Sequence, residues 1–314
     1  MNQKTGSGKY EQLLDRCKSI EPIPTAVAHP CEMTALMGAM EAAELGLIKP
    51  ILVGPSKKID SVAKAAKIDL TNSEIVDSNH SHDSAAKAVA LIREGKAELL
   101  MKGSLHTDEL MSAIVSREGG LRTSRRISHV FIMDVPTYHK VLIITDGAIN
   151  IAPSLEDKID ICQNAIDLVI SLGRDLPKVA ILAAVETVNS KMQATIDAAA
   201  LCKMAERGQI TGGLLDGPLA FDNAISADAA KTKGIISKVA GDPDILLAPD
   251  LEAGNMLAKQ LSFLANADSA GLVLGAKVPV ILTSRADNVR SRIASCAVAV
   301  LAAHARRQQA GVAV

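Results

Sequence analysis

The segment VPVILTSRADNVRSR, residues 278–292, places three reactive side chains beside one another. Its apolar, β-branched beginning predicts a buried strand, and Ser284, Arg285 and Asp287 follow where a helix is predicted to begin. A guanidinium in such a place can bind an anion, and a carboxylate can move a proton. The structural alternative is that Asp287 caps the last helix while Arg285 forms a surface ion pair. These residues alone leave both interpretations open.

A second group of polar residues follows another predicted strand, in LMKGSLHTDEL, residues 100–110. Lys102, Gly103, His106 and Thr107 stand between the end of this strand and the start of a helix. Ligands of open parallel sheets bind outside the carboxyl ends of strands, and the N–H groups at a helix start attract anions. Gly103 would let a phosphate approach the backbone closely. An ordinary turn with polar caps explains the same residues equally well.

Arginine dominates the connection SREGGLRTSRRISH, residues 116–129, which contains no lysine. Arg122 stands at its centre, with Arg117, Arg125 and Arg126 around it. Because guanidinium groups bind phosphate through two parallel hydrogen bonds, this loop could hold a polyanionic substrate. A solvated surface loop is the more common explanation of a run of charge.

Polar residues also end other predicted strands, and they could line the same site. Asp146 and Asn150 precede a helix predicted to begin near Ser154, and similar groups occur in residues 214–226 and 248–257. Turn chemistry alone uses the same residue types.

His80, His82 and Asp83 could be metal ligands, but Ser81 or His82 to Asp83 also stands where a helix needs a capping side chain. Because the sequence offers no second cluster to complete a coordination shell, the cap is favoured.

Composition narrows the class of protein. The chain has 314 residues, of which 48% are hydrophobic but only 2% aromatic, so the core must be aliphatic and an α/β fold is favoured. The net charge of -1 and the scarcity of aromatic residues argue against nucleic acid as a partner. No apolar run reaches the roughly 20 residues of a membrane span, and the N-terminus does not resemble a signal peptide. The five widely spaced cysteines fit reduced thiols, so a cytoplasmic protein is expected.

Short apolar runs alternate with helical patterns along the whole chain, which predicts βαβ units around a largely parallel sheet. The expected strands lie at 25–29, 50–54, 97–103, 130–135, 141–147, 178–185, 211–217, 244–250 and 270–282. The expected helices include 31–46, 56–67, 81–96, 189–207, 251–266 and 287–308. We predict a first α/β domain of residues 1–138, completed by the C-terminal helix 288–314, and a second of residues 139–287.

Taken in order, MKGSLHT, GLRTSRRISHVFIMDVP, ITDGAINIAPSLEDK, DGPLAFDNAIS, PDLEAGNML and LTSRAD resemble the phosphate acetyltransferase and phosphate butyryltransferase family. The resemblance covers essentially the whole chain. The form LTSRAD and the block KMAERGQITGGLLDGPLAFDNAIS are more similar to the butyryltransferase branch.

The resemblance implies two α/β domains with a central cleft, as in the isocitrate and isopropylmalate dehydrogenases, and a homodimer formed largely through residues 139–287. It also implies reversible transfer of a short acyl group, such as acetyl, propionyl or butyryl, between coenzyme A and inorganic phosphate. Coenzyme A is then a substrate, and no cofactor or metal is expected.

For the site, the resemblance implies that Asp287 accepts the thiol proton of coenzyme A, that Arg285 binds phosphate, and that Ser284 donates a hydrogen bond. The residues expected to bind phosphate or coenzyme A are Lys102, Gly103, His106, Thr107, Arg122 and Asn150. Two alternatives stay open: a metal- and NAD(P)-dependent β-decarboxylating dehydrogenase of the same fold, and a non-catalytic protein that binds coenzyme A or acyl phosphate.

Overall fold

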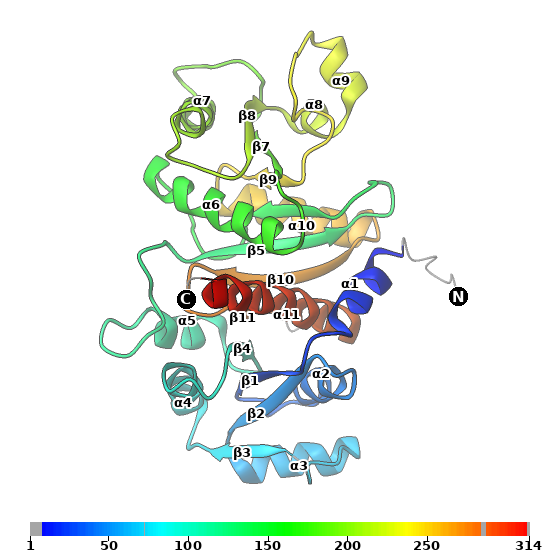
Figure 1. Ribbon diagram of the computed structural model, residues 1–314, viewed down its shortest axis with the longest axis vertical. Coiled ribbons are helices and arrows are strands. Elements are labelled where there is room, and N and C mark those ends of the chain that lie inside the picture. The colour runs from blue at the N-terminus through cyan, green and yellow to red at the C-terminus, as the bar shows by residue number, and fades with distance from the viewer. Residues whose placement is uncertain (1–7, 72, 284–286, 313–314) are drawn as a thin grey trace. The chain divides into compact units, whose positions relative to one another are not determined.

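The computed structural model describes residues 8–71, 73–283 and 287–312, and these form two compact units (Figure 1). Within the described residues, the terminal unit consists of residues 10–125 and 270–312, and the middle unit consists of residues 126–269 with residues 8 and 9. The units change at residues 125 and 269, whereas the predicted limits are 138 and 287. Segments from the first and last thirds of the chain therefore form one unit, as predicted for the C-terminal helix.

The terminal unit is a sheet with strand order β3-β2-β1-β4-β11-β10 and helices on both faces. Its strands are β1 Ile23–Ala28, β2 Ile48–Gly54, β3 Glu74–Asp77, β4 Leu99–Lys102, β10 Asp268–Leu274 and β11 Val280–Ile281. Its helices are α2 Met33–Glu44, α3 Ser56–Ala66, α4 Ser81–Arg93, α5 Thr107–Val115 and α11 Val289–Val312, and α1 Lys9–Cys17 precedes them.

Strand order in the terminal unit reverses between β1 and β4. The chain first builds outward from β1 through β2 to β3, then returns through α4 to place β4 on the other side of β1, with all these neighbours parallel. In Figure 1, α2 and α3 lie on one side of these strands, and α4 and α5 lie on the other. This is the switch in topology that creates a crevice at the carboxyl ends of adjacent strands in open α/β sheets.

The expected strand at 270–282 is two strands. β10 and β11 form an antiparallel hairpin in which Leu272 pairs with Ile281, and Gly275, with a φ of 82°, begins the connection. β11 also pairs in parallel with β4. Continuous apolar character does not reveal a turn, and only the glycine marked this one.

The middle unit contains the strand order β5-β6-β9-β7-β8, and Figure 1 shows α6 and α10 on opposite sides of it. Its strands are β5 Ser128–Asp134, β6 Leu142–Thr145, β7 Lys178–Leu182, β8 Leu214–Leu219 and β9 Ile245–Leu247. Its helices are α6 Leu155–Ser171, α7 Gln193–Glu206, α8 Phe221–Ile225, α9 Ala227–Thr232 and α10 Leu251–Leu264. The β5–β6 pair is antiparallel and the other pairs are parallel.

Helix starts in this unit follow ordinary capping chemistry. Ser154 caps α6 by accepting a hydrogen bond from the Asp157 amide at 3.2 Å, which confirms the predicted start. Asp250 caps α10 in the same way through the amide of Ala253, at 2.8 Å. Asp250 is thus one of the polar residues at strand ends that turn chemistry explains.

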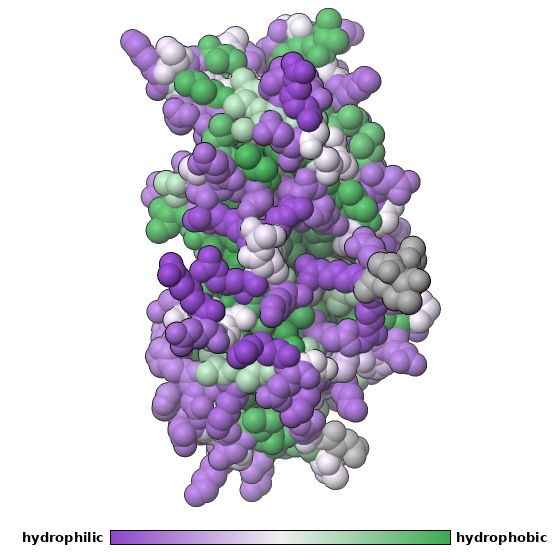
Figure 2. Space-filling model, turned by 60° about the vertical axis from the view of Figure 1, so that its left-hand side comes forward, coloured by the Kyte–Doolittle hydropathy of each residue, from purple (hydrophilic) through white to green (hydrophobic). Residues whose placement is uncertain are grey.

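The core is aliphatic, as the composition predicts. Buried side chains are mainly Ala, Val, Ile and Leu, and Tyr138 is a rare aromatic among them. Figure 2 shows hydrophilic side chains over much of one face, with apolar side chains scattered among them. Among the described residues, no helix has both the length and the apolar character needed to cross a membrane.

Candidate active site

The first group of expected site residues lies where the order of strands reverses. His29 directly follows β1, and Lys102 ends the neighbouring strand β4. The two strands run in parallel, with Ala28 level with Lys102, so their carboxyl ends meet at one edge. Ligands of open α/β sheets bind at such an edge. We call residues 29–31, 102–107, 282–283 and 287 the switch edge.

Close backbone contacts join the two strands at this edge. The His29 carbonyl accepts hydrogen bonds from the Ser104 amide at 2.9 Å and from the Ser104 hydroxyl at 2.8 Å. The Gly103 amide donates to the Ala28 carbonyl at 2.8 Å. A Cβ atom on Gly103 would lie 2.3 Å from the Ala28 oxygen and 2.5 Å from the His29 oxygen. The position where a side chain would stand is therefore filled by the protein backbone, so the contact with β1 by itself requires a glycine here, and the approach of phosphate stays a prediction.

His29 is a residue of this edge that the sequence analysis did not select. Its backbone is left-handed, with a φ of 58°, and its Nδ1 lies 2.8 Å from the Ser84 hydroxyl. Ser84 in turn contacts the Ser78 hydroxyl at 2.7 Å and donates to the His80 carbonyl at 2.9 Å. Burial lowers the pKa of His29, and the nearby Lys58 ammonium adds to this effect, so the ring is neutral at neutral pH. No sequence pattern signals this contact, because Ser84 comes from a distant helix.

Lys102 is almost completely buried, with 4% of its surface exposed. Its Nζ lies 3.4 Å from the Gly103 carbonyl and has a further interaction partner. A buried ammonium needs such acceptors because desolvation is costly. The Lys102 ammonium is therefore buried at the end of β4 and is not part of the solvated surface.

His106 and Thr107 stand at the start of α5 and are exposed. The amide of His106 donates to Glu109 Oε2 at 2.9 Å. Glu109 Oε1 accepts a hydrogen bond from the Ser81 hydroxyl at 2.8 Å and lies 3.3 Å from His82 Nε2. Burial alone would raise the pKa of Glu109, but the hydrogen bonds from Ser81 and His106 outweigh it and leave the pKa below its ordinary value. A carboxylate therefore fixes the turn that presents His106 and Thr107.

The strand β11 brings the second group of expected residues to the same edge. Val280 pairs with Leu100 and Ile281 with Met101, so the residues after β11 come level with Lys102 and Gly103. Ser284 and Arg285 lie outside the described residues. Asp287 is half-buried and begins the described chain beyond them.

The cap of the last helix is Asn288. Its Oδ1 accepts a hydrogen bond from the Ser291 amide at 2.9 Å, and α11 begins at Val289. This contact supplies the cap that was the structural alternative for Asp287, so Asp287 is not required for that purpose.

The backbone of Arg122 lies at the amino end of β11, whereas Lys102 lies at its carboxyl end. It forms an antiparallel bridge with Ala276, and the Leu121 carbonyl accepts from the Lys277 amide at 2.8 Å. Ala276 precedes β11, whereas the switch edge follows it. The exposed Arg122 side chain therefore starts from the amino end of β11.

Asn150 belongs to the middle unit, where it is 5% exposed. Its amide group donates to Asp146 Oδ2 at 2.6 Å and to the Ile127 carbonyl at 3.0 Å. Its oxygen accepts from Arg126 Nε at 2.7 Å. These protein contacts support a structural role and leave little of the Asn150 side chain for a substrate.

Asp146 is the centre of this arrangement, with 3% of its surface exposed. Oδ1 accepts from the amides of Ala148 and Ile149, at 2.8 and 3.0 Å. Oδ2 accepts from the amides of His129 and Asn150, at 3.1 and 3.3 Å, as well as from the Asn150 side chain. We call Asp146, Asn150 and the amides that they bind the Asp146 knot. Its charge is fully used in joining the ends of β5 and β6.

The histidines at 80 and 82 do not complete a metal centre in the part of the chain that the structure describes, which contains no group of three or more suitable ligands. His80 instead caps α4, because its Nδ1 accepts from the Asp83 amide at 3.3 Å. Asp83 accepts from the Asn79 amide at 2.8 Å. The prediction that a side chain caps this helix is confirmed, but the capping residue is His80 and not one of residues 81–83.

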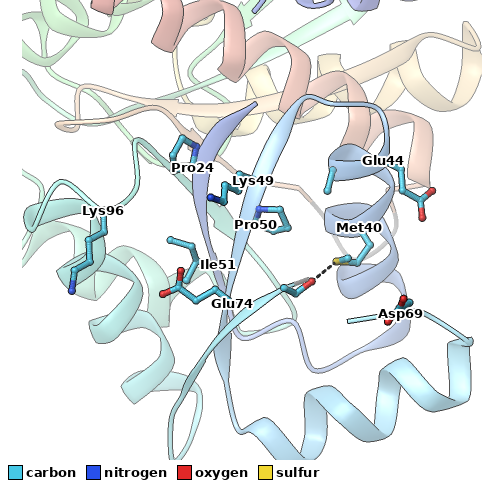
Figure 3. A pocket seen from close by; sticks show the side chains of 11 residues that line it. Pro24, Met40, Glu44, Lys49, Pro50, Ile51, Asp69, Glu74 and Lys96 are labelled. Atoms are coloured by element: carbon cyan, nitrogen blue, oxygen red, sulfur yellow. Dashed lines mark hydrogen bonds between the residues drawn. The ribbon is translucent and has the colours of Figure 1, made fainter. Parts of the chain in front are cut away.

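A pocket of about 680 Å³ opens at the opposite ends of β1, β2 and β3 (Figure 3). It includes Pro24, Lys49 and Glu74 from the first residues of these strands, and Ser73 donates to Met40 Sδ there at 3.8 Å. Because ligands of such sheets bind at the carboxyl ends, this pocket is not the candidate active site.

Comparison with solved structures defines the class of protein. The chain is similar to a branched-chain phosphotransacylase from Enterococcus faecalis V583, with a TM-score of 0.80 and 29% identity. The match covers 90% of this chain and 99% of the other. The fold is thus the mixed α/β fold of phosphotransacylases, as far as the large sheet and its helices define it.

Sequence comparison then gives the family. Residues 80–300 match the model described as phosphate acetyl/butaryl transferase. A phosphate acetyltransferase from Rhizobium meliloti is 65% identical over 305 residues, which cover 97% of this chain and 96% of that protein. A phosphate butyryltransferase from Clostridium beijerinckii is 40% identical over 95% of this chain and 98% of that protein. The chain belongs to the phosphate acetyl/butaryl transferase family, which confirms the resemblance and the expected class of enzyme, an acyltransferase.

These identities do not support the finer expectation of a butyryltransferase-like sequence. The relative named an acetyltransferase is considerably more similar than the relative named a butyryltransferase. The motif LTSRAD was therefore a poor guide to the branch within the family.

Proposed function

We propose that this protein transfers a short acyl group reversibly between coenzyme A and inorganic phosphate, so that acyl-CoA and phosphate give acyl phosphate and free coenzyme A. The observation that carries the proposal is the family match over residues 80–300, together with 65% identity to a phosphate acetyltransferase over almost the whole chain. The same similarity makes acetyl the first acyl group to test.

The proposed mechanism is direct displacement with both substrates bound. When acyl phosphate is the donor, the sulfur of coenzyme A attacks the carbonyl carbon, the bond to the phosphate oxygen breaks, and the thiol proton must leave. A free thiol has a pKa near 8.5, so a neighbouring base assists the reaction. We assign acceptance of this proton to Asp287 of the switch edge, which is half-buried and is not needed as the cap of α11.

Binding of phosphate is assigned to Lys102 of the switch edge and, from the sequence, to Ser284 and Arg285, which lie outside the described residues. Lys102 and Arg285 would neutralise charge on the phosphate and on the developing oxyanion, and Ser284 would donate a hydrogen bond. The exposed start of α5, with His106 and Thr107, would add N–H groups suited to an anion. Gly103 supports this edge through its close contact with β1.

Arg122 and Asn150 have weaker support within the proposal. Arg122 is exposed and could reach a distant part of coenzyme A, whereas the hydrogen bonds of Asn150 already join it to Asp146 and Arg126. We therefore keep Arg122 as a candidate contact and assign Asn150 an indirect role.

The test is release of coenzyme A, followed with a thiol reagent, from acetyl-CoA and butyryl-CoA with and without inorganic phosphate. We expect strictly phosphate-dependent release, a loss of at least about 10²-fold in Arg285→Ala, and a slower reaction in Asp287→Asn. Release that ignores phosphate, or none from any short acyl-CoA, would contradict acyl transfer and leave a binding protein or a dehydrogenase to be tested.

The finer description of the fold, two domains like those of isocitrate and isopropylmalate dehydrogenases, is also part of this proposal. So is a homodimer formed through residues 139–287. The exposed apolar side chains of α10 support the dimer, since Met256, Phe263 and Leu264 are 58%, 73% and 82% exposed.

Sedimentation of Phe263→Glu would test this surface. We expect a dimeric wild type, a dissociated Phe263→Glu variant and an unaffected Leu45→Glu control, because Leu45 is 53% exposed and lies outside residues 139–287. A monomeric wild type would contradict the dimer.

The cytoplasmic location stays a prediction, supported by the absence of disulfide bonds among the five cysteines.

A further inference from the structure

Arg292 is a buried arginine in the first turns of α11. Only 3% of its surface is exposed, and Cys296 and Val300, four and eight residues further along the helix, are 0% and 1% exposed. Arg292 thus occupies the buried stripe of the helix. Burial of a guanidinium is costly unless hydrogen bonds and opposite charges compensate for it.

A side-chain hydrogen bond joins Arg292 directly to the switch edge. Nη1 donates to the Thr283 hydroxyl at 2.8 Å, and Thr283 is itself buried, with 4% exposed. Asp287, on the other side of residues 284–286, attracts the same guanidinium. Arg292 therefore interacts with the described residues on both sides of the proposed catalytic segment.

The opposing helix α2 makes room for this side chain. A Cβ atom on Gly38 would lie 2.7 Å from Arg292 Cδ, which is too close for unchanged packing. The pair of Gly38 and Arg292 is thus matched in shape, and a larger residue at position 38 would displace the arginine.

Stability alone is a weak explanation of this arrangement. An apolar side chain of similar length in a buried site is often as stabilising as a buried ion pair. The neighbours of Arg292 along the stripe are apolar, so the helix could pack without a charge. The guanidinium adds a fixed hydrogen bond and a positive charge next to Thr283 and Asp287.

We propose that Arg292 is a positioning residue for acyl transfer: it holds Thr283 by hydrogen bonding and Asp287 by charge attraction, and so orients the carboxylate that accepts the thiol proton. This inference rests on the proposed function. Arg292 does not touch the substrate in this account, and its effect passes through Thr283 and Asp287.

Three ionisable groups lie near Arg292: Asp287, Glu32 before α2, and Cys296 on α11, whose thiol burial keeps neutral by raising its pKa to about 12. The attraction between Arg292 and Asp287 requires a positive charge, so Arg292→Lys should keep part of it and Arg292→Met should lose it.

The test compares wild type, Arg292→Met, Arg292→Lys and Gly38→Ala, with Arg290→Met as the matched control. Arg290 is on the same helix, but it stacks on Tyr10 at 3.6 Å and pairs with Glu11 at 3.3 Å. The measurements are kcat and KM for phosphate-dependent release of coenzyme A and urea unfolding of each variant.

We expect kcat of Arg292→Met to fall by about 10- to 100-fold, as for a small misplacement of a catalytic group. KM should change much less, and Arg292→Lys should restore part of the lost kcat because it keeps the positive charge. Gly38→Ala should lower kcat in the same direction, and Arg290→Met should resemble wild type.

An Arg292→Met variant with wild-type kcat would overturn the inference. So would a variant whose activity falls only in proportion to its folded fraction, without partial recovery of kcat in Arg292→Lys, because that is the signature of a purely structural role. A wild-type protein without phosphate-dependent release would refute the proposed function itself, and the inference with it.

Discussion

The switch edge and the Asp146 knot both gather polar side chains where strands end, yet they use them differently. In the Asp146 knot, one buried carboxylate accepts five hydrogen bonds from the protein, and Asn150 joins it to Arg126. At the switch edge, His106 and Thr107 are exposed at a helix start, and Asp287 is half-buried. The two regions therefore differ in burial: the fold encloses the polar groups of the Asp146 knot, whereas the switch edge leaves His106 and Thr107 open to solvent.

This comparison predicts that the knot controls stability and the switch edge controls turnover. For each variant below, both the free energy of unfolding and the rate of turnover are to be measured. A variant of one region with the effect expected for the other would contradict the comparison.

The largest effect on stability is expected for Asp146→Ala. The change leaves several buried N–H groups without their acceptor, so the free energy of unfolding should fall by about 3 to 5 kcal/mol. Urea denaturation measures this loss, with the exposed Asp175→Ala as control. A fully stable variant without turnover would place Asp146 in the active site and break the comparison.

Gly103→Ala should act mainly on turnover. The added Cβ must push against the Ala28 and His29 carbonyl oxygens, which moves the ends of β1 and β4 apart. We expect phosphate-dependent release of coenzyme A to fall by about 10²-fold, measured on protein whose folded state is verified by circular dichroism. Gly119→Ala is the control, because its Cβ would meet only the flexible end of Arg93 at 3.3 Å. Normal turnover in Gly103→Ala would show that this contact does not shape the site.

The pH dependence of stability should depend on His129, next to Asp146. Burial lowers the pKa of His129 to about 4, and the neighbouring Asp146 only partly opposes this. An unfolded histidine titrates near 6.5, so the unfolded chain binds a proton first as pH falls. The stabilisation is complete above about pH 6.5 and is lost toward pH 4, with a total of about 1 to 3 kcal/mol.

Urea unfolding of His129→Leu between pH 7 and pH 4 checks this sign. We expect a shallower loss of stability than in wild type, whereas His304→Leu, on α11, should keep the wild-type slope. Parallel slopes in wild type and His129→Leu would mean that other groups cause the acid sensitivity.

Ser84→Ala should have the smallest effect of these changes. It removes the hydroxyl that contacts His29 Nδ1, Ser78 and the His80 carbonyl. A cost of about 1 to 2 kcal/mol in unfolding is expected for the buried groups left unpaired. If turnover falls far more than stability, then orientation of His29 matters for the reaction, which would extend the switch edge to Ser84. Ser171→Ala is the control, because that hydroxyl donates only to the Leu168 carbonyl within its own helix.

The sequence determined the fold class and much of the element order. Alternating apolar runs and helical patterns predict nearly all of the strands from β1 to β9, because buried strands and amphipathic helices have distinct periods. Capping chemistry predicts the start of α6 at Ser154, since that contact is local. Local patterns gave no clear sign of β3, whose four residues are only half-buried or exposed.

The tertiary structure decided which residues lie together. The register of β11 against β4 brings residues near 102 and residues near 283 to one edge of the sheet. Local sequence does not reveal strand pairing of this kind. The same holds for His29 with Ser84 and for Arg292 with Gly38 and Thr283.

The spacing of Arg292, Cys296 and Val300, four residues apart on one helix, indicates from the sequence that Arg292 shares a face with apolar residues. All three are buried in the structure. The chemical groups of the protein, and the helices and strands that carry them, follow from local sequence. Which of those groups are enclosed by hydrogen bonds, as at Asp146, and which come to the switch edge depends on contacts between distant segments, which local sequence does not contain.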